Sequence, residues 1–148
     1  MTEREPAREL ALTPGILPRR WIGAWIDFVV LVLFLLVPDA VLGNDLYQRT
    51  LPVWLLLLVL YFPVSEGLTG RSLGKVVTGT RVVTAEGDLP GLRRAAIRTL
   101  TRLVEVNPFL LGGVPAGIAV LSSRHRQRLG DMAAGTFVVR AADLPSST

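Results

Sequence analysis

Two apolar blocks separated by polar stretches dominate the hydrophobic pattern of this chain. The first runs from Trp21 to Val37 and ends at Pro38-Asp39, and the second, LPVWLLLLVLYFPV, covers residues 51–64. With the turns on either side, the first block approaches the roughly 20 residues that cross about 30 Å of hydrocarbon. Both blocks carry tryptophan or tyrosine near their ends, where amphipathic rings favour the membrane interface. We therefore predict two transmembrane helices, of which the second is the shorter.

A third apolar block, VNPFLLGGVPAGIAVLSS at residues 106–123, is interrupted by prolines and glycines. Broken helices at membrane depth need protein around them. A single crossing would leave the arginines between 124 and 140 outside the cell, against the tendency of basic residues to remain in the cytoplasm. We therefore favour a broken, re-entrant segment over residues 103–121 that returns to its starting side. A single crossing is the alternative.

The polar stretch from Glu66 to Arg102 contains two further predicted elements. The segment GTRVVTAEG, from residue 79, indicates a short β-strand followed by a turn. Its GT-x-VV pattern recurs at residues 135–139, and two such strands can pair as a ribbon only on the same side of the membrane. The segment GLRRAAIRTLTRLVEV, from residue 91, predicts a helix.

This predicted helix is amphipathic on a 3.6-residue wheel. Its apolar side carries Leu92, Ala96, Leu100 and Leu103, and its basic side carries Arg94, Arg98 and Arg102. It can lie in the headgroup plane, or it can pack on the protein with a solvated basic face. We predict that these three arginines contact anionic lipid headgroups, together with Arg71 and Lys75 of the turn GRSLGK.

Composition supports a membrane protein with a basic cytoplasmic face. The chain has 148 residues, 50% of them hydrophobic, a mean hydropathy of +0.46, a net charge of +4 and a pI near 10.6. The basic residues adjoin apolar blocks and form no nucleic-acid reading motif, so the predicted partner is the bilayer and not nucleic acid. There is no cysteine, and His125 lies in an arginine-rich loop. We therefore predict no metal site and no cofactor.

Charge also predicts the topology. No signal peptide precedes Trp21, so the first span is expected to be an uncleaved anchor. Arg19 and Arg20 precede it, and seven basic residues follow the second block, which predicts a multi-pass protein with a cytoplasmic N-terminus. We divide the chain into an N-terminal tail at 1–18, a membrane domain at 19–140 and a C-terminal tail at 141–148.

Two short motifs resemble catalytic sites only superficially. GRSLGK has one residue too few between its glycines for a phosphate-binding loop, and Val76 stands where serine or threonine is required. The acids Glu86 and Asp88 lie in TAEGDLP, where glycine and proline indicate a turn. We therefore predict that the protein is not an enzyme.

Three segments in order, RRWIGAWID, TGRSLGKVVTGTRVV and RQRLGDMAAGTFVV, resemble the RDD family of bacterial integral membrane proteins over residues 18–140. The arginine and two aspartates that name the family correspond to Arg20, Asp27 and Asp131. The resemblance implies a protein of the bacterial cell (inner) membrane, and some members have been linked to sodium/proton exchange. The family's usual three spans differ from the interrupted third block and short second span of this chain.

The charge of Asp27 within the first span costs roughly 2.5–3.5 kcal/mol on insertion scales unless it has a partner. Arg20 precedes it by seven residues on the same helix face, at a distance of about 10 Å along the axis. We therefore expect Asp131 to pair with Arg20, and Arg126 or Arg128 to reach Asp27.

Two functions are compatible with this cluster. In the first, Arg20, Asp27 and Asp131 are structural, and the protein is a membrane component that assembles with itself or with another membrane protein. In the second, the aspartates bind a proton or sodium and Arg20 tunes their pKa values, as in a cation/proton exchanger. Asp27 is about 9 Å beyond Trp21, and wholly apolar sequence follows it. This favours the structural alternative.

Overall fold

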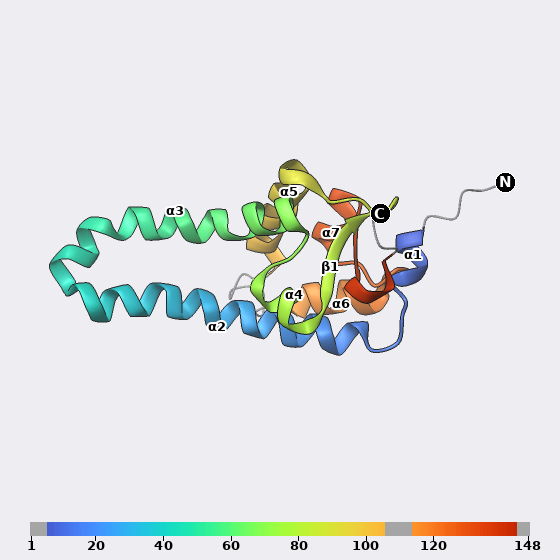
Figure 1. Cartoon of the computed structure of the whole chain (residues 1–148), viewed down its shortest axis with the longest axis horizontal. Coiled ribbons are helices and arrows are strands. Elements are labelled where there is room, and N and C mark those ends of the chain that lie inside the picture. The colour runs from blue at the N-terminus through green and yellow to red at the C-terminus, as the bar shows by residue number, and fades with distance from the viewer. Residues whose placement is uncertain (1–5, 106–113, 145–148) are drawn as a thin grey trace.

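The computed structural model describes residues 6–105 and 114–144. Two long helices form an antiparallel hairpin that projects from a compact group of short elements (Figure 1). The hairpin consists of α2 (Ile16–Leu42) and α3 (Asn44–Thr69), joined at Gly43. We call the remaining elements the cap. They are α1 (Pro6–Leu10), α4 (Leu73–Thr78), β1 (Thr80–Thr84), α5 (Gly91–Glu105), α6 (Val114–Ser122), α7 (Leu129–Ala134), β2 (Thr136–Arg140) and a 3-10 turn (Ala141–Asp143).

The hairpin helices are long and apolar enough to cross a membrane. At 1.5 Å per residue, their 27 and 26 residues extend to about 40 Å, more than the ~30 Å of hydrocarbon. They are longer than the sequence predicted. The predicted end of the first span at Pro38 was wrong, because α2 continues through this proline to Leu42. A helix loses one backbone hydrogen bond at an internal proline, and membrane helices tolerate this loss.

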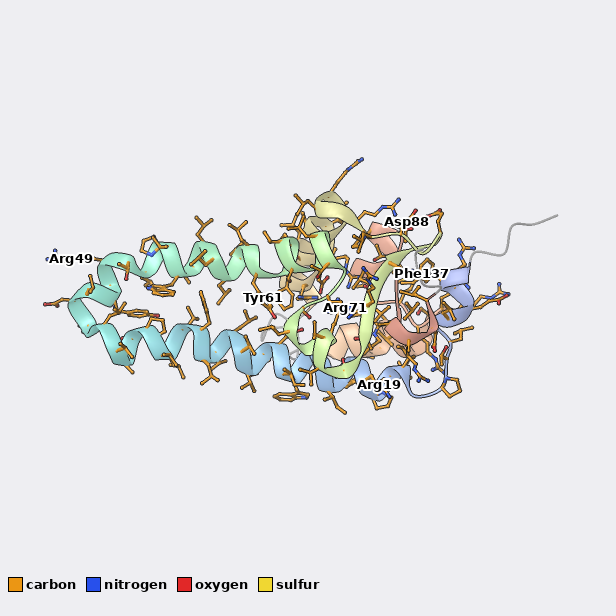
Figure 2. All side chains as sticks on the ribbon, viewed as in Figure 1. Arg19, Arg49, Tyr61, Arg71, Asp88 and Phe137 are labelled. Carbon is orange, nitrogen blue, oxygen red and sulfur yellow. The ribbon has the colours of Figure 1, made fainter. Side chains whose placement is uncertain are left out.

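The surface of the hairpin is almost entirely apolar along its length (Figure 2). Arg49 lies at the tip and Arg19 at the opposite end, next to the cap (Figure 2). Asp27 and Glu66 are both buried, and both lie toward the cap end. The charged groups of the hairpin therefore lie mainly near its two ends.

The two GT-x-VV segments pair as an antiparallel ribbon in the cap, with Val82 opposite Val138 and Thr84 opposite Thr136. Alternate residues along a strand point to opposite faces. One face contributes Val83, Phe137 and Val139 to an apolar cluster with Ala7 and Ala11 of the N-terminal segment. The other face carries buried threonines toward the interior of the cap.

Close approaches at glycines attach the cap to the hairpin. Gly74 of α4 lies directly against Gly23 of α2, where an added Cβ would collide with the Gly23 backbone. At Gly67 of α3, an added Cβ would be 2.8 Å from Leu92 Cδ2 of α5. The chain reverses into α4 after Gly70, which ends α3 with a φ of 71°. These contacts place α4 against α2, and α5 against α3.

Part of the third apolar block lies outside the described residues, which omit 106–113. Its remainder forms α6, where Gly117 faces the Trp21 ring of α2. The prediction of re-entry over residues 103–121, and its alternative of a crossing, remain predictions. Within the described ranges, two helices have the length and composition of a span.

Candidate functional site: a buried charge cluster

A buried arginine of α5 joins two buried carboxylates where the hairpin meets the cap. Arg98 Nε donates to Glu66 Oε2 of α3 at 3.0 Å, and Arg98 Nη1 donates to Asp131 Oδ1 of α7. Nη1 also donates to Thr136 Oγ1 of the ribbon at 2.8 Å. All three charged side chains are fully buried. Arg98 thus connects α3, α5, α7 and β2 through charged hydrogen bonds.

Glu66 has two further cationic partners. Lys75 Nζ of α4 donates to Glu66 Oε1 at 2.8 Å, and Arg102 Nη2 donates to the same oxygen at 3.1 Å. The guanidinium carbon of Arg102 lies 3.5 Å from the ring centroid of Phe62, which is a cation–π contact. One carboxylate therefore accepts from a lysine and two arginines. This compensates the cost of placing its charge away from water.

Asp131 binds the first helix through Arg20. Arg20 Nη2 donates to Asp131 Oδ2 at 2.8 Å, and Arg20 Nη1 donates to the carbonyl oxygen of Arg126 at 2.5 Å. The backbone N–H of Arg128 also donates to Oδ2, at 3.2 Å, and the Arg128 side chain approaches Oδ1 at 3.9 Å. The structure thus brings Arg20 and Asp131 together, as the sequence led us to expect.

Asp27 occupies a separate site with neutral donors. Its Oδ1 accepts from the Tyr61 hydroxyl at 2.9 Å and from the Gly74 N–H at 2.8 Å. Its Oδ2 accepts from Ser72 Oγ at 2.5 Å. The expectation that Arg126 or Arg128 reaches Asp27 was wrong, because α3, the turn after it and the start of α4 pack on α2 and supply these donors instead. Lys75 Nζ, 3.3 Å from Ser72 Oγ, links this site to the cluster.

The cluster shifts the pKa values of its cap residues. Burial alone would raise the pKa of Asp131, but Arg98 and Arg20 hold it well below its ordinary range. Burial lowers the pKa of Lys75 to about 8, although Glu66 acts in the opposite direction. The pKa of Arg98 is raised, because Asp131 and Glu66 outweigh its burial. Asp131 and Arg98 therefore keep their charges at neutral pH.

Of the two predicted arrangements of α5, packing on the protein with a solvated basic face was wrong. Leu92 and Leu100 are 53% and 64% exposed, whereas Arg98 is 1% exposed and lies among the carboxylates. The prediction that Arg98 contacts lipid headgroups was therefore wrong. The physical reason is that Glu66 and Asp131 draw the arginine inward. The outer surface of the helix carries Leu92 and Leu100 together with exposed Arg93.

The other predicted headgroup contacts lie in different environments. Lys75 and Arg102 point inward to Glu66, with 13% and 15% of their side chains exposed. Arg71, in the turn between α3 and α4, and Arg94, on α5, are both partly exposed. Lipid contact by Arg71 and Arg94 stays a prediction.

Sequence reasoning missed Glu66, and it gave Arg98 the wrong environment. Glu66 follows the apolar run ending at Val64 and was assigned to the polar stretch after the span. The sequence did contain an indication that Glu66 belongs to the second helix, because it lies within one helical turn of the apolar residues that end at Val64. A second signal was the pair of arginines at 98 and 102, whose i, i+4 spacing suits a shared carboxylate.

The two acids of TAEGDLP lie in a turn. The backbone N–H of Thr84 donates to the Asp88 carbonyl at 2.9 Å, and that of Gly87 donates to the Thr84 carbonyl at 3.1 Å. Among the described residues, no three His, Cys, Asp or Glu side chains gather in a way that could hold a metal ion.

A family model covers most of the chain. The model of the RDD family matches residues 13–135, which include both hairpin helices, α4, α5 and α7. The chain belongs to the RDD family. No curated protein and no solved structure matches it significantly. Family membership and the two apolar helices together indicate a membrane protein.

In this RDD protein, Arg20, Asp27 and Asp131 occupy two sites. Arg20 and Asp131 pair within the charge cluster, whereas Asp27 fastens α4 to the hairpin. Each of these contacts joins a hairpin helix to the cap. Their common effect is to hold the cap in place.

Proposed function

We propose that the protein is a non-enzymatic, multi-pass component of the bacterial inner membrane that acts by assembling with itself or with another membrane protein. One observation carries the proposal. In the most apolar stretches of α2 and α3, 6% and 11% of the residues are buried within the chain. Two helices that cover so little of each other leave a large surface for lipid or for neighbouring helices.

The arrangement of the charge cluster supports a structural role for it. Asp131 is held by Arg20 and Arg98, and Glu66 by Lys75, Arg98 and Arg102. A proton or sodium ion would have to displace these fixed partners before it could bind. In this proposal the cluster locks the cap to the hairpin, and the exposed hairpin faces mediate assembly.

The cap would lie on the cytoplasmic side, against anionic headgroups. Figure 1 shows the cap gathered at one end of the hairpin. Exposed apolar side chains of α4 and α5, such as Val77 and Leu100, suit the boundary between headgroups and acyl chains. Partly exposed Arg71 and Arg94 would then bind lipid phosphate.

Cross-linking in native membranes tests assembly, because the chain has no cysteine. Single cysteines would replace exposed residues such as Val29 of α2 and Leu56 of α3, with a set of positions around each helix. We expect disulfide-linked dimers, or adducts with a partner, from one helix face and not from the others. No adduct at any position, together with a monomer by light scattering in detergent, would contradict the proposal.

A flux assay tests the proposal against ion exchange. Purified protein in liposomes is expected to produce no proton flux when a sodium gradient is applied. A flux that disappears in Asp27→Asn or Asp131→Asn would instead make the protein an exchanger and remove the assembly proposal.

A further inference from the structure

The charge cluster contains more positive than negative charge. Among the described residues it has five cations and two carboxylates, an excess of three positive charges. The cations are Arg20, Lys75, Arg98, Arg102 and Arg128, and the carboxylates are Glu66 and Asp131. Including Asp27, which is connected through Ser72, still leaves an excess of two. Uncompensated charge away from water is costly, so the cluster favours an additional anion.

Three nitrogen atoms of the cluster are buried and lack an acceptor in the described structure. They are Nη2 of Arg98, Nη1 of Arg102 and Nε of Arg128. Buried donors are almost always satisfied in folded proteins, and a missing partner indicates an ion, a water or a ligand. Two of these arginines, Arg102 and Arg128, are the partly exposed ones and so lie at the edge of the cluster.

Arg102 and Arg128 belong to different elements, and each lies beside a carboxylate that Arg98 also bonds, Glu66 and Asp131 respectively. Arg102 is on α5, and Arg128 immediately precedes α7. Burial lowers the pKa of Arg102, and the positive charges of Arg128 and Arg98 lower it further. Together they outweigh the opposite effect of Glu66. The Arg102 and Arg128 side chains are 15% and 19% exposed, so both reach the surface of the cap, whereas the Arg98 side chain is fully buried.

We propose that Arg102 and Arg128 form a binding site for a phosphate-type anion, with buried Arg98 adding charge. Guanidinium groups bind phosphate oxygens through paired hydrogen bonds, and an anion there would offset the excess charge. Its source is either the phosphate of a phospholipid headgroup or free inorganic phosphate. Leu129, which directly follows Arg128, is 49% exposed, which suits an acyl chain beside the headgroup. The site does not depend on the proposed role in assembly.

Thermal unfolding of the full chain in non-ionic detergent, followed by tryptophan fluorescence, tests the site. One arm compares inorganic phosphate with chloride at equal ionic strength, and the other compares phosphatidylglycerol with phosphatidylcholine in mixed micelles. We expect saturable stabilisation by at least one phosphate probe. Arg128→Gln should weaken its apparent affinity about tenfold, the effect of one charged hydrogen bond. Arg93→Gln makes the same charge change at an exposed position of α5, and it should change the apparent affinity for the phosphate probe by no more than about twofold.

The outcomes separate the two sources. Stabilisation by phosphatidylglycerol alone assigns the site to a headgroup, and stabilisation by inorganic phosphate assigns it to the free ion. If neither probe exceeds its control, or if Arg128→Gln and Arg93→Gln behave alike, the proposal is overturned. Should Arg128→Gln fail to fold, Arg128→Lys keeps the charge but loses the paired geometry, and its affinity should still fall below that of the unchanged protein.

Discussion

At the residue scale, the unusual feature is a glutamate at the end of an apolar helix that is fully buried and held by three cations. The attraction between buried ions is largely offset by their loss of hydration. Removing one partner, however, leaves the others buried without compensation. Substitutions in the cluster should therefore have large and unequal effects.

Glu66→Gln should lower the free energy of unfolding by about 3–5 kcal/mol, because Arg98, Arg102 and Lys75 lose their shared carboxylate. Chemical unfolding in detergent measures this loss. Glu86→Gln is the matched control, since Glu86 is exposed and should change stability by no more than about 0.5 kcal/mol. Equal stability of the two variants would show that the buried contacts contribute nothing.

Arg20→Gln and Asp131→Asn should be coupled, because their side chains contact each other at 2.8 Å. A double-mutant cycle should give an interaction of roughly 0.5–3 kcal/mol. Asp27 is held by Tyr61, Ser72 and Gly74 instead, so the losses from Arg20→Gln and Asp27→Asn should add. Coupling of Arg20 with Asp27, without coupling to Asp131, would contradict the two-site arrangement.

Lys75 is the one lysine of the sequence, so its Cε signal in a lysine-labelled sample can be assigned directly. A titration followed by NMR should give a pKa of about 8, because burial disfavours the charged amine. A value near the ordinary 10.4 would contradict the burial of the amine.

The same shift predicts how stability varies with pH. The folded pKa lies below that of the unfolded chain, so the unfolded state binds more protons between about pH 8 and 10.4. Stability should therefore rise with pH across this window, by at most about 3 kcal/mol, and Lys75 should add no pH dependence below it. The Lys75→Met variant should lack this rise.

At the element scale, α4 depends on a backbone contact that only glycine allows. Gly74→Ala should destabilise the protein by about 1–3 kcal/mol, because the new Cβ meets the Gly23 carbonyl and the Asp27 carboxylate. Gly117→Ala in α6 is the control, since its Cβ would lie 3.5 Å from Trp21, an ordinary contact. Thermal unfolding in detergent compares them. A Gly74→Ala protein as stable as Gly117→Ala would show that α4 can move away from α2.

At the scale of the whole molecule, both described ends of the chain lie in the cap, beyond the same end of the hairpin (Figure 1). A membrane around the hairpin would therefore leave α1 and the C-terminal 3-10 turn on one side. The tip of the hairpin would lie on the other side.

Cysteine labelling tests this topology. An impermeant maleimide should label Glu9→Cys and Ala142→Cys from the same side of oriented vesicles, and Asn44→Cys from the opposite side. All three positions are exposed, so the side of the membrane decides their labelling. Labelling of Glu9→Cys and Ala142→Cys from opposite sides would mean that the chain crosses the membrane a third time.

The sequence by itself determined the local elements of this protein. Long apolar runs predict membrane helices, repeated GT-x-VV segments predict paired strands, and residues 91–105 have helical periodicity. These patterns depend on near neighbours in the chain. The pairing of Arg20 with Asp131 could also be anticipated, because charges beside a membrane span need partners of opposite sign.

Only the tertiary structure decided the environment of each charge. An amphipathic wheel separates Arg98 from Leu100 but cannot say which side faces the protein, because both lipid and a buried carboxylate are possible surroundings. The position of Glu66 on α3 turned the arginines inward. Likewise, two partners of Asp27, Ser72 and Gly74, come from 45 and 47 residues away in sequence. Such contacts depend on how distant segments pack, which local sequence patterns do not determine.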